Sequence, residues 1–186
     1  MTLSNTIINI INEFYPTGAP ARDVFLSHSE AVARKALQVA RKVPHLNPDL
    51  EFVEQAAMLH DIGIFYARAP EIGCFGEYPY VCHGYLGRQL METKGLFRHA
   101  LVCERHVGVG LTLEEILKYP LPLPHRDMVP VSLEEQIVCY ADKFFSKKPG
   151  KSEEWPVEMV LKSLETYGPQ KVARFKEWLA VFGENS

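Results

Sequence analysis

Residues 54–63 read Glu-Gln-Ala-Ala-Met-Leu-His-Asp-Ile-Gly. The apolar run predicts a helix with an imidazole and a carboxylate, His60 and Asp61, near its C-terminal end, and Gly63 would let the helix stop. Successive helical residues point about 100° apart, so these two side chains can flank one small ion without sharing a face. The same pair also suits a surface hydrogen bond or a helix cap, so the rest of the chain must decide between these interpretations.

The composition is that of an ordinary globular protein, with 47% hydrophobic and 23% charged residues among 186. We expect a single domain over residues 1–186, with its motif-bearing core at about 22–146 and packing helices at about 153–182. The formal net charge is −3, so the chain lacks the excess of basic residues with which duplex-binding proteins neutralise phosphates. We therefore expect no duplex nucleic-acid partner. No apolar run reaches the roughly 18 residues of a membrane span and no signal-peptide pattern is present, which predicts a cytoplasmic protein with no membrane partner.

Helical periodicity runs through the chain, and no segment shows strand periodicity with turn signals, so the predicted fold class is all-α, a helical bundle. The predicted helices cover about residues 4–15, 22–43, 48–61, 81–94, 96–106, 113–119, 133–145, 153–167 and 169–182. Ser4 and Asn47 are expected to cap their helices, with Pro48 at the first helical position, and capping boxes begin at Thr112 and Ser132. Residues 64–80 lack a period and are expected to form a long ordered loop, typical of a functional lid.

Cysteine spacing bears on both redox state and metal binding. The four cysteines have no paired spacing, which argues against a zinc knuckle and a disulfide framework. Buried free thiols are the expectation for Cys74, Cys82, Cys103 and Cys139.

Imidazoles and carboxylates recur at positions that should be buried. They are His28, His60, Asp61, His83, His106 and Asp142, spread over five predicted helices. Each histidine alone is compatible with a hydrogen-bonded core residue, and Asp142 with a buried salt bridge. Together they need many partners inside one helical core, and a shared metal centre would satisfy them all. His45, His99 and His125 are expected to be ordinary histidines.

This ordered set resembles the HD-domain metal-dependent phosphohydrolases of the binuclear type. The resemblance rests on a first histidine, the string His-Asp-Ile-Gly at 60–63, two further histidines and the late aspartate in Ala-Asp-Lys at 141–143, and it covers about residues 25–145. It implies that His28, His60, Asp61 and Asp142 hold one metal and that His83 and His106 hold a second, with Asp61 as the bridge. Two divalent transition-metal ions, iron, manganese, zinc, nickel or cobalt, suit such nitrogen and oxygen ligands.

The resemblance also implies chemistry. Water between two such ions would lose a proton near neutral pH and attack phosphorus as hydroxide. The candidates to stabilise the phosphate are Arg22, Lys35, Arg68, Arg105 and Lys143. The expected function is a phosphohydrolase acting on a small phosphate ester or a nucleotide, and the sequence carries no signal for oligomeric state.

The sequence departs from the family pattern in two places, and two functions other than phosphate hydrolysis remain as alternatives. Many family members carry a lysine where Ile64 stands here, and no acid follows the doublet before Glu71, so simple deoxynucleoside monophosphatase activity is not expected. One alternative is a di-iron oxygenase of the same superfamily that cleaves a carbon bond of a polyol or phosphonate. The other is an inactive, ligand-sensing helical domain.

Overall fold

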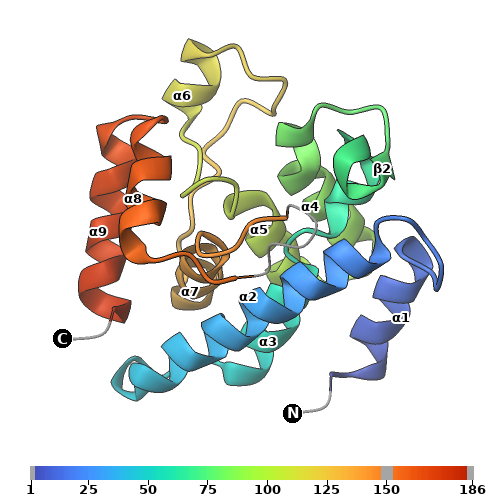
Figure 1. Ribbon diagram of the computed structural model, residues 1–186, viewed down its shortest axis with the longest axis horizontal. Helices are drawn as coiled ribbons and strands as arrows, with labels where there is room; N and C mark the ends of the chain where they lie inside the picture. The colour runs from blue at the N-terminus through green and yellow to red at the C-terminus, as the bar shows by residue number, and fades with distance from the viewer. Residues whose placement is uncertain (1–2, 148–152, 184–186) are drawn as a thin grey trace.

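The computed structural model describes residues 3–147 and 153–183. In this part of the chain the only sheet is one pair of two-residue strands, and α-helices make up the rest of the framework, which confirms the all-α prediction (Figure 1). The α-helices are α1 (Asn5–Phe14), α2 (Arg22–Lys42), α3 (Leu50–Leu59), α4 (His83–Thr93), α5 (Phe97–Arg105), α6 (Leu113–Lys118), α7 (Leu133–Asp142), α8 (Val157–Glu165) and α9 (Pro169–Phe182). No helix within the described ranges is both long and apolar enough to cross a bilayer.

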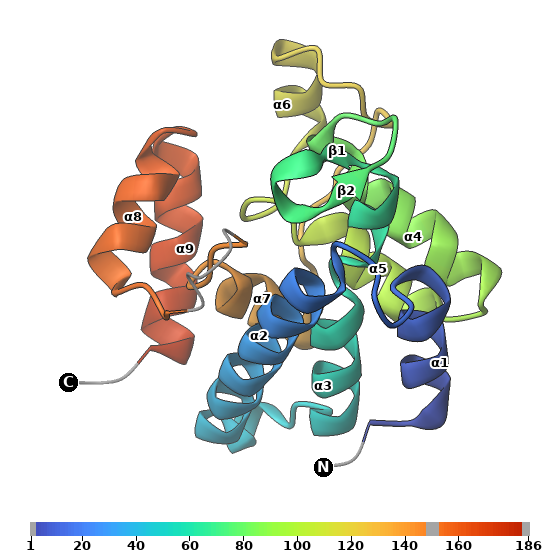
Figure 2. The same cartoon turned by 45° about the vertical axis from the view of Figure 1, so that its right-hand side comes forward.

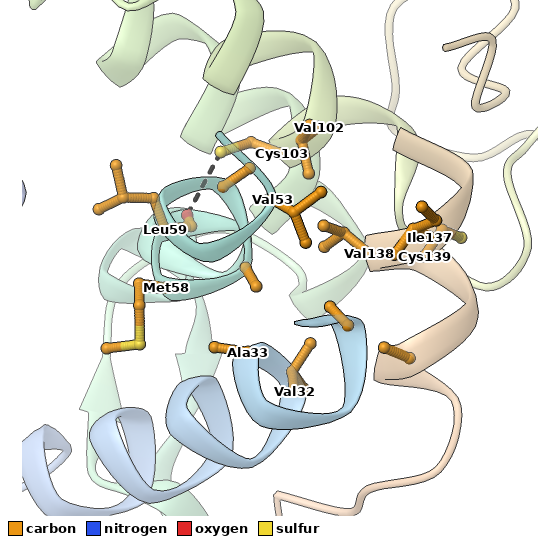
Figure 3. Packing of buried hydrophobic residues seen from close by; sticks show 14 of the residues in the cluster. Val32, Ala33, Val53, Met58, Leu59, Val102, Cys103, Ile137, Val138 and Cys139 are labelled. Carbon is orange, nitrogen blue, oxygen red and sulfur yellow. Dashed lines mark hydrogen bonds between the residues drawn. The ribbon is translucent and has the colours of Figure 1, made fainter. Parts of the chain in front are cut away.

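The hydrophobic core lies where α2, α3, α5 and α7 meet, and Figure 3 shows side chains from all four helices gathered there. Val32, Leu59 and Val138 are fully buried in it. Burial of each such side chain contributes roughly 1.5–3 kcal/mol to folding. The Cys103 thiol donates to the carbonyl oxygen of Leu59 at 3.3 Å, drawn as a dashed line in Figure 3. All four cysteines are buried and free, as expected.

Most helix starts follow their predicted caps, but α3 does not. Asp49, not Asn47, is its N-cap, and the Asp49 carboxylate accepts from the backbone N–H of Phe52 at 3.1 Å. Asn47 instead ends a short 3₁₀ helix, η1 (Pro44–Leu46), in the left-handed conformation with φ 53°. Asparagine tolerates that conformation better than most residues, so it serves as a terminator rather than a cap.

The capping box expected at Ser132 is only half formed. The Ser132 hydroxyl accepts from the Glu135 backbone N–H at 3.2 Å. The Glu135 carboxylate does not return to Ser132, because it accepts from the Val131 backbone N–H at 2.8 Å and pairs with Arg105. At Thr112 both halves of the box are present.

Gly63 has a different role from the predicted one. Helix α3 ends at Leu59 with His60 as its C-cap, and the chain continues as the 3₁₀ helix η2 (Ile62–Tyr66). A Cβ on Gly63 would stand 2.1 Å from the carbonyl oxygen of His83 and 2.4 Å from the nitrogen of Gly87. The glycine is therefore needed because the backbones of η2 and α4 touch, not because a helix must end there.

The expected loop at 64–80 contains more regular structure than the sequence predicted. Strands β1 (Arg68–Ala69) and β2 (Cys74–Phe75) pair antiparallel, and the 3₁₀ helices η3 (Pro70–Ile72) and η4 (Tyr80–Cys82) flank β2. The expectation of no strand was wrong here, because two-residue strands are too short to produce a period in the sequence. The hairpin sits above the start of α2 in Figure 2.

Helix α9 packs against α7, and α8 packs against α9. The ring of Phe175 in α9 stacks on that of Tyr140 with centroids 5.1 Å apart. Helix α8 begins at Val157, later than predicted, because Pro156 is its extended N-cap. Helix α9 begins at Pro169, as predicted.

Candidate metal centre

The fold brings six of the sequence-predicted side chains into one cluster. His28 comes from α2, His60 and Asp61 follow α3, His83 begins α4, His106 follows α5 and Asp142 ends α7. They form two groups that could each hold a metal ion, one of His28, His60, Asp61 and Asp142 and one of Asp61, His83 and His106. Within each group the candidate ligand atoms lie within 4.8 Å of one another. All six are buried, with at most 5% of each residue exposed.

The Asp61 carboxylate lies between the two groups. Its Oδ2 is 3.2 Å from Nε2 of both His28 and His60. Its Oδ1 is 3.2 Å from Nε2 of His106 and 3.4 Å from Nε2 of His83. Each carboxylate oxygen therefore faces a different pair of imidazoles.

Asp142 completes the first group. Its Oδ1 is 3.0 Å from Nε2 of His28 and 3.4 Å from Nε2 of His60. The first group thus has two nitrogens and two carboxylates around one point, whereas the second has two nitrogens and one carboxylate.

Backbone carbonyls orient three of the histidines. Nδ1 of His60, His83 and His106 lies 2.6, 2.6 and 2.7 Å from the carbonyl oxygen three residues earlier, in Ala57, Tyr80 and Cys103. Each Nδ1 must carry a proton to donate this bond, so in the neutral ring Nε2 keeps its lone pair and points into the cluster.

The second group contains an arrangement that suits a cation. Nε2 of His83 and Nε2 of His106 are 3.1 Å apart. Because both rings use Nδ1 as the donor, two lone pairs face each other in the neutral rings, and a positive ion relieves the repulsion between them. Burial lowers the pKa of His83 to about 3 and also lowers that of His106, which keeps both rings neutral.

The first group carries the negative charge. Burial by itself would raise the pKa of Asp61 and Asp142, but the facing His60 and the nearby lysines outweigh it and hold both pKa values well below the ordinary range. Burial lowers the pKa of His60, yet the two carboxylates reverse this and raise it to about 9. Buried anions call for a cation, so the donor set fits metal ions.

Comparison with known proteins identifies the family. Residues 25–146 match the HD domain. The chain belongs to the HD domain family.

The relatives of this HD-domain chain include two tRNA (cytidine(56)-2′-O)-methyltransferases. That of Thermoplasma volcanium is 31% identical over 127 residues and that of Picrophilus torridus 33% over 127 residues, and each alignment covers 68% of this chain and 33% of the relative. An uncharacterized protein of Methanocaldococcus jannaschii, MJ0778, is 33% identical over 120 residues, 63% of each chain. The chain therefore spans a third of the methyltransferases' length and less than two thirds of MJ0778. The comparison with solved structures gave no match.

Two lysines of the HD-domain chain reach the carboxylates. Lys143 Nζ is 2.6 Å from Oδ2 of Asp142 and donates to the carbonyl oxygen of His106 at 3.3 Å. Lys147 Nζ is 2.8 Å from Oδ2 of Asp61 and 3.9 Å from Oδ1 of Asp142. Sequence reasoning named Lys143 and missed Lys147. Its position five residues after Asp142 was the available signal, but nothing local indicates that the chain turns back there.

The other candidate cations have their contacts elsewhere. Lys35 pairs with Glu154 at 2.6 Å, and Arg105 pairs with Glu135 at 2.9 Å. Arg22 donates to Asn12 at 2.9 Å and to the carbonyl oxygen of Tyr15. These contacts tie neighbouring segments together and do not involve any of the six cluster residues.

Proposed function

We propose that this protein is a metal-dependent phosphohydrolase acting on a small phosphate ester or a nucleotide. The observation that carries the proposal is the Asp61 carboxylate, whose two oxygens face two separate pairs of buried imidazoles. A shared carboxylate suits a centre of two cations, and two-metal sites are common among enzymes that cleave phosphate esters.

The residues would divide between two divalent transition-metal ions, iron, manganese, zinc, nickel or cobalt. His28, His60, Asp61 and Asp142 would hold the first, and His83 and His106 the second, with Asp61 in common. Such ions lower the pKa of water from 15.7 towards about 7 and withdraw charge from phosphoryl oxygens.

The side chains around the cluster would orient and stabilise the phosphoryl group. Lys143 and Lys147 place two ammonium groups beside the carboxylates. Once cations neutralise those carboxylates, the ammonium groups can attract the non-bridging oxygens of a phosphate, where negative charge accumulates during the reaction. The centroid of the Tyr80 ring lies 4.7 Å from that of His83, beside the second group.

The two methyltransferase relatives are about three times as long as the region that matches this chain, so their names refer to larger proteins. We do not propose methyl transfer here, because a buried cluster of imidazoles and carboxylates is a metal-binding arrangement. The partner that we propose is a small phosphorylated molecule.

The test combines metal analysis with a substrate panel. Protein purified without added metal is analysed for bound transition metals and then assayed with phosphomonoesters, phosphodiesters and nucleotides, with and without iron or manganese. We expect bound metal and phosphate release that is lost in Asp61→Ala but kept in Asp23→Ala, a change at an exposed aspartate of α2. Substrate-dependent oxygen uptake without phosphate release, or the absence of bound metal, would contradict the proposal.

A further inference from the structure

Tyr80 lies beside the second group of the metal centre and also reaches solvent. It begins η4, and its carbonyl oxygen accepts from the backbone N–H of His83 and, at 2.6 Å, from Nδ1 of the same residue. The centroids of the two rings are 4.7 Å apart. Tyr80 is 37% exposed, whereas none of the six cluster residues is more than 5% exposed. A molecule that approaches from solvent can therefore contact Tyr80 next to the buried cluster.

The hydroxyl of Tyr80 lies close to the charged groups of the centre. Asp61 and Asp142 act on it by their charge, and the Lys147 ammonium donates a hydrogen bond to it. Lys147 Nζ is also 2.8 Å from Oδ2 of Asp61, and its side chain is 20% exposed. The ammonium therefore lies between the phenol and the carboxylate that both groups share.

The hydrogen of this phenol is not used within the protein. A hydroxyl donates one hydrogen bond and accepts up to two, whereas an ammonium can only donate. The bond from Lys147 thus uses the Tyr80 oxygen as an acceptor and leaves the phenolic hydrogen for another partner. Among the described residues, none accepts a hydrogen bond from it. Burial raises the pKa of Tyr80, so the hydroxyl keeps its proton at neutral pH.

An anionic oxygen suits the position in front of this hydroxyl. It can accept the phenolic hydrogen, and the neighbouring Lys147 charge attracts it. A terminal phosphate carries about −1.5 to −2 charges near pH 7 and has three oxygens outside the ester bond. A phosphodiester has one such oxygen fewer and a smaller charge. The terminal phosphate can therefore direct oxygens towards the cluster and still offer one to Tyr80.

We infer that Tyr80 is a substrate-binding residue whose hydroxyl donates a hydrogen bond to an oxygen of a terminal phosphate, while Lys147 orients that hydroxyl. The substrate class of the centre is then a phosphomonoester and not a phosphodiester. The inference rests on the proposed function for the reaction itself, but phosphate binding needs no turnover and can be measured separately.

The first test measures the binding of inorganic phosphate to the manganese-loaded full chain by calorimetry. We expect Tyr80→Phe to bind phosphate about tenfold more weakly than the wild type, because a hydrogen bond to a charged acceptor is lost. Its manganese affinity should stay within about twofold, since the carbonyl oxygen of residue 80 still accepts from His83. The matched control is Tyr78→Phe, because Tyr78 is 45% exposed and lines the cavity beside the β1–β2 hairpin instead.

Three outcomes of this test would overturn the inference. They are equal phosphate affinity in Tyr80→Phe and the wild type, no phosphate binding by the wild type, and a loss of manganese affinity in Tyr80→Phe as large as the loss of phosphate affinity. The last would show that the hydroxyl supports the metal ligands and not the substrate.

The second test separates this inference from the proposed function. Steady-state rates are compared for p-nitrophenyl phosphate and bis(p-nitrophenyl) phosphate. We expect Tyr80→Phe to lower kcat/KM about tenfold for the monoester and less than about twofold for the diester. An equal loss on both, or hydrolysis of the diester alone, would overturn the inference. Phosphate binding that depends on Tyr80, without hydrolysis of either ester, would support the inference and refute the proposed function.

Discussion

Each oxygen of the Asp61 carboxylate faces two histidines, and its Oδ2 also accepts the Lys147 ammonium at 2.8 Å. In this arrangement the ammonium supplies the positive charge that a metal ion would supply. A cation that enters the first group must therefore compete with Lys147 for the same oxygen.

Removal of that ammonium should change metal affinity. In Lys147→Met we expect several-fold tighter binding of manganese by calorimetry, because the competing charge is gone, and a less stable metal-free protein, because Asp61 loses its partner. Lys162→Met, at an exposed position of α8, serves as the control and should bind as the wild type does. Weaker binding in Lys147→Met would show that the ammonium does not compete.

His99 predicts a pH effect that is independent of the cluster. Burial, and then the Arg98 charge, lower its pKa from 6.5 to about 4, and its ring packs edge-on against Phe52 at 4.9 Å. The unfolded chain therefore takes up a proton below pH 6.5 that the folded protein refuses until about pH 4, so stability falls as the pH falls through this window. Between pH 7 and pH 5 the free energy of unfolding falls by about 2 kcal/mol because of His99.

The measurement is urea unfolding of the metal-free protein at both pH values. His99→Gln has no imidazole to titrate at this position. We therefore expect its free energy of unfolding to fall by about 2 kcal/mol less between pH 7 and pH 5 than that of the wild type. An unchanged difference would mean that His99 is protonated in the folded protein at pH 5.

At the scale of secondary structure, the contact between η2 and α4 positions both groups. Gly63 follows the His60–Asp61 doublet by two residues, and it lies against the carbonyl oxygen of His83, the first residue of α4. The close backbone contact that Gly63 permits thus holds His60 and Asp61, which follow α3, near His83 at the start of α4.

Gly63→Ala should therefore disturb both stability and metal binding. The added Cβ must push η2 away from α4, and we expect a loss of about 3 kcal/mol, as in strongly overpacked cores, with weaker metal binding because His83 moves. Gly95→Ala is the control, because Gly95 has φ 72° but open space around it, so only backbone strain of about 1 kcal/mol applies. Equal effects of the two changes in chemical unfolding would argue against the steric explanation.

Local signals predicted many helix ends but not the contacts between segments. Ser4, Thr112 and Pro169 begin or cap their helices as expected, since a cap involves only neighbouring residues. Asn47 and Gly63 took other roles, because the first depends on the preceding 3₁₀ helix and the second on a helix twenty residues further along.

At the scale of the whole molecule, the candidate ligands could be predicted from sequence because polar residues at buried positions need partners. The six side chains that stood out in this way meet in one cluster. The lysines were harder to assign, because a long flexible side chain can face solvent or the core from the same position. Lys147 reaches Asp61, whereas Lys35 reaches Glu154.

Metal binding should stabilise the entire fold, since the six side chains come from segments spread between α2 and α7. An ion at a hundred times its dissociation constant adds about 2.7 kcal/mol, which corresponds to an increase in Tm of roughly 5–10 °C for a protein of this size. We expect this increase on adding manganese to chelator-treated protein in calorimetric scans. Asp61→Ala should show none of it, and an equal increase in that variant would indicate binding elsewhere.

Because Asp61 belongs to both groups, two ions would not bind to them independently. The first cation to bind would withdraw electron density from both Asp61 oxygens, so Asp61 would be a weaker donor ligand for a second cation at the remaining histidine pair. Loading should then proceed in two unequal steps, and at scarce metal the population would be dominated by half-loaded molecules. Metal supply would in this way set the fraction of molecules that carry both ions.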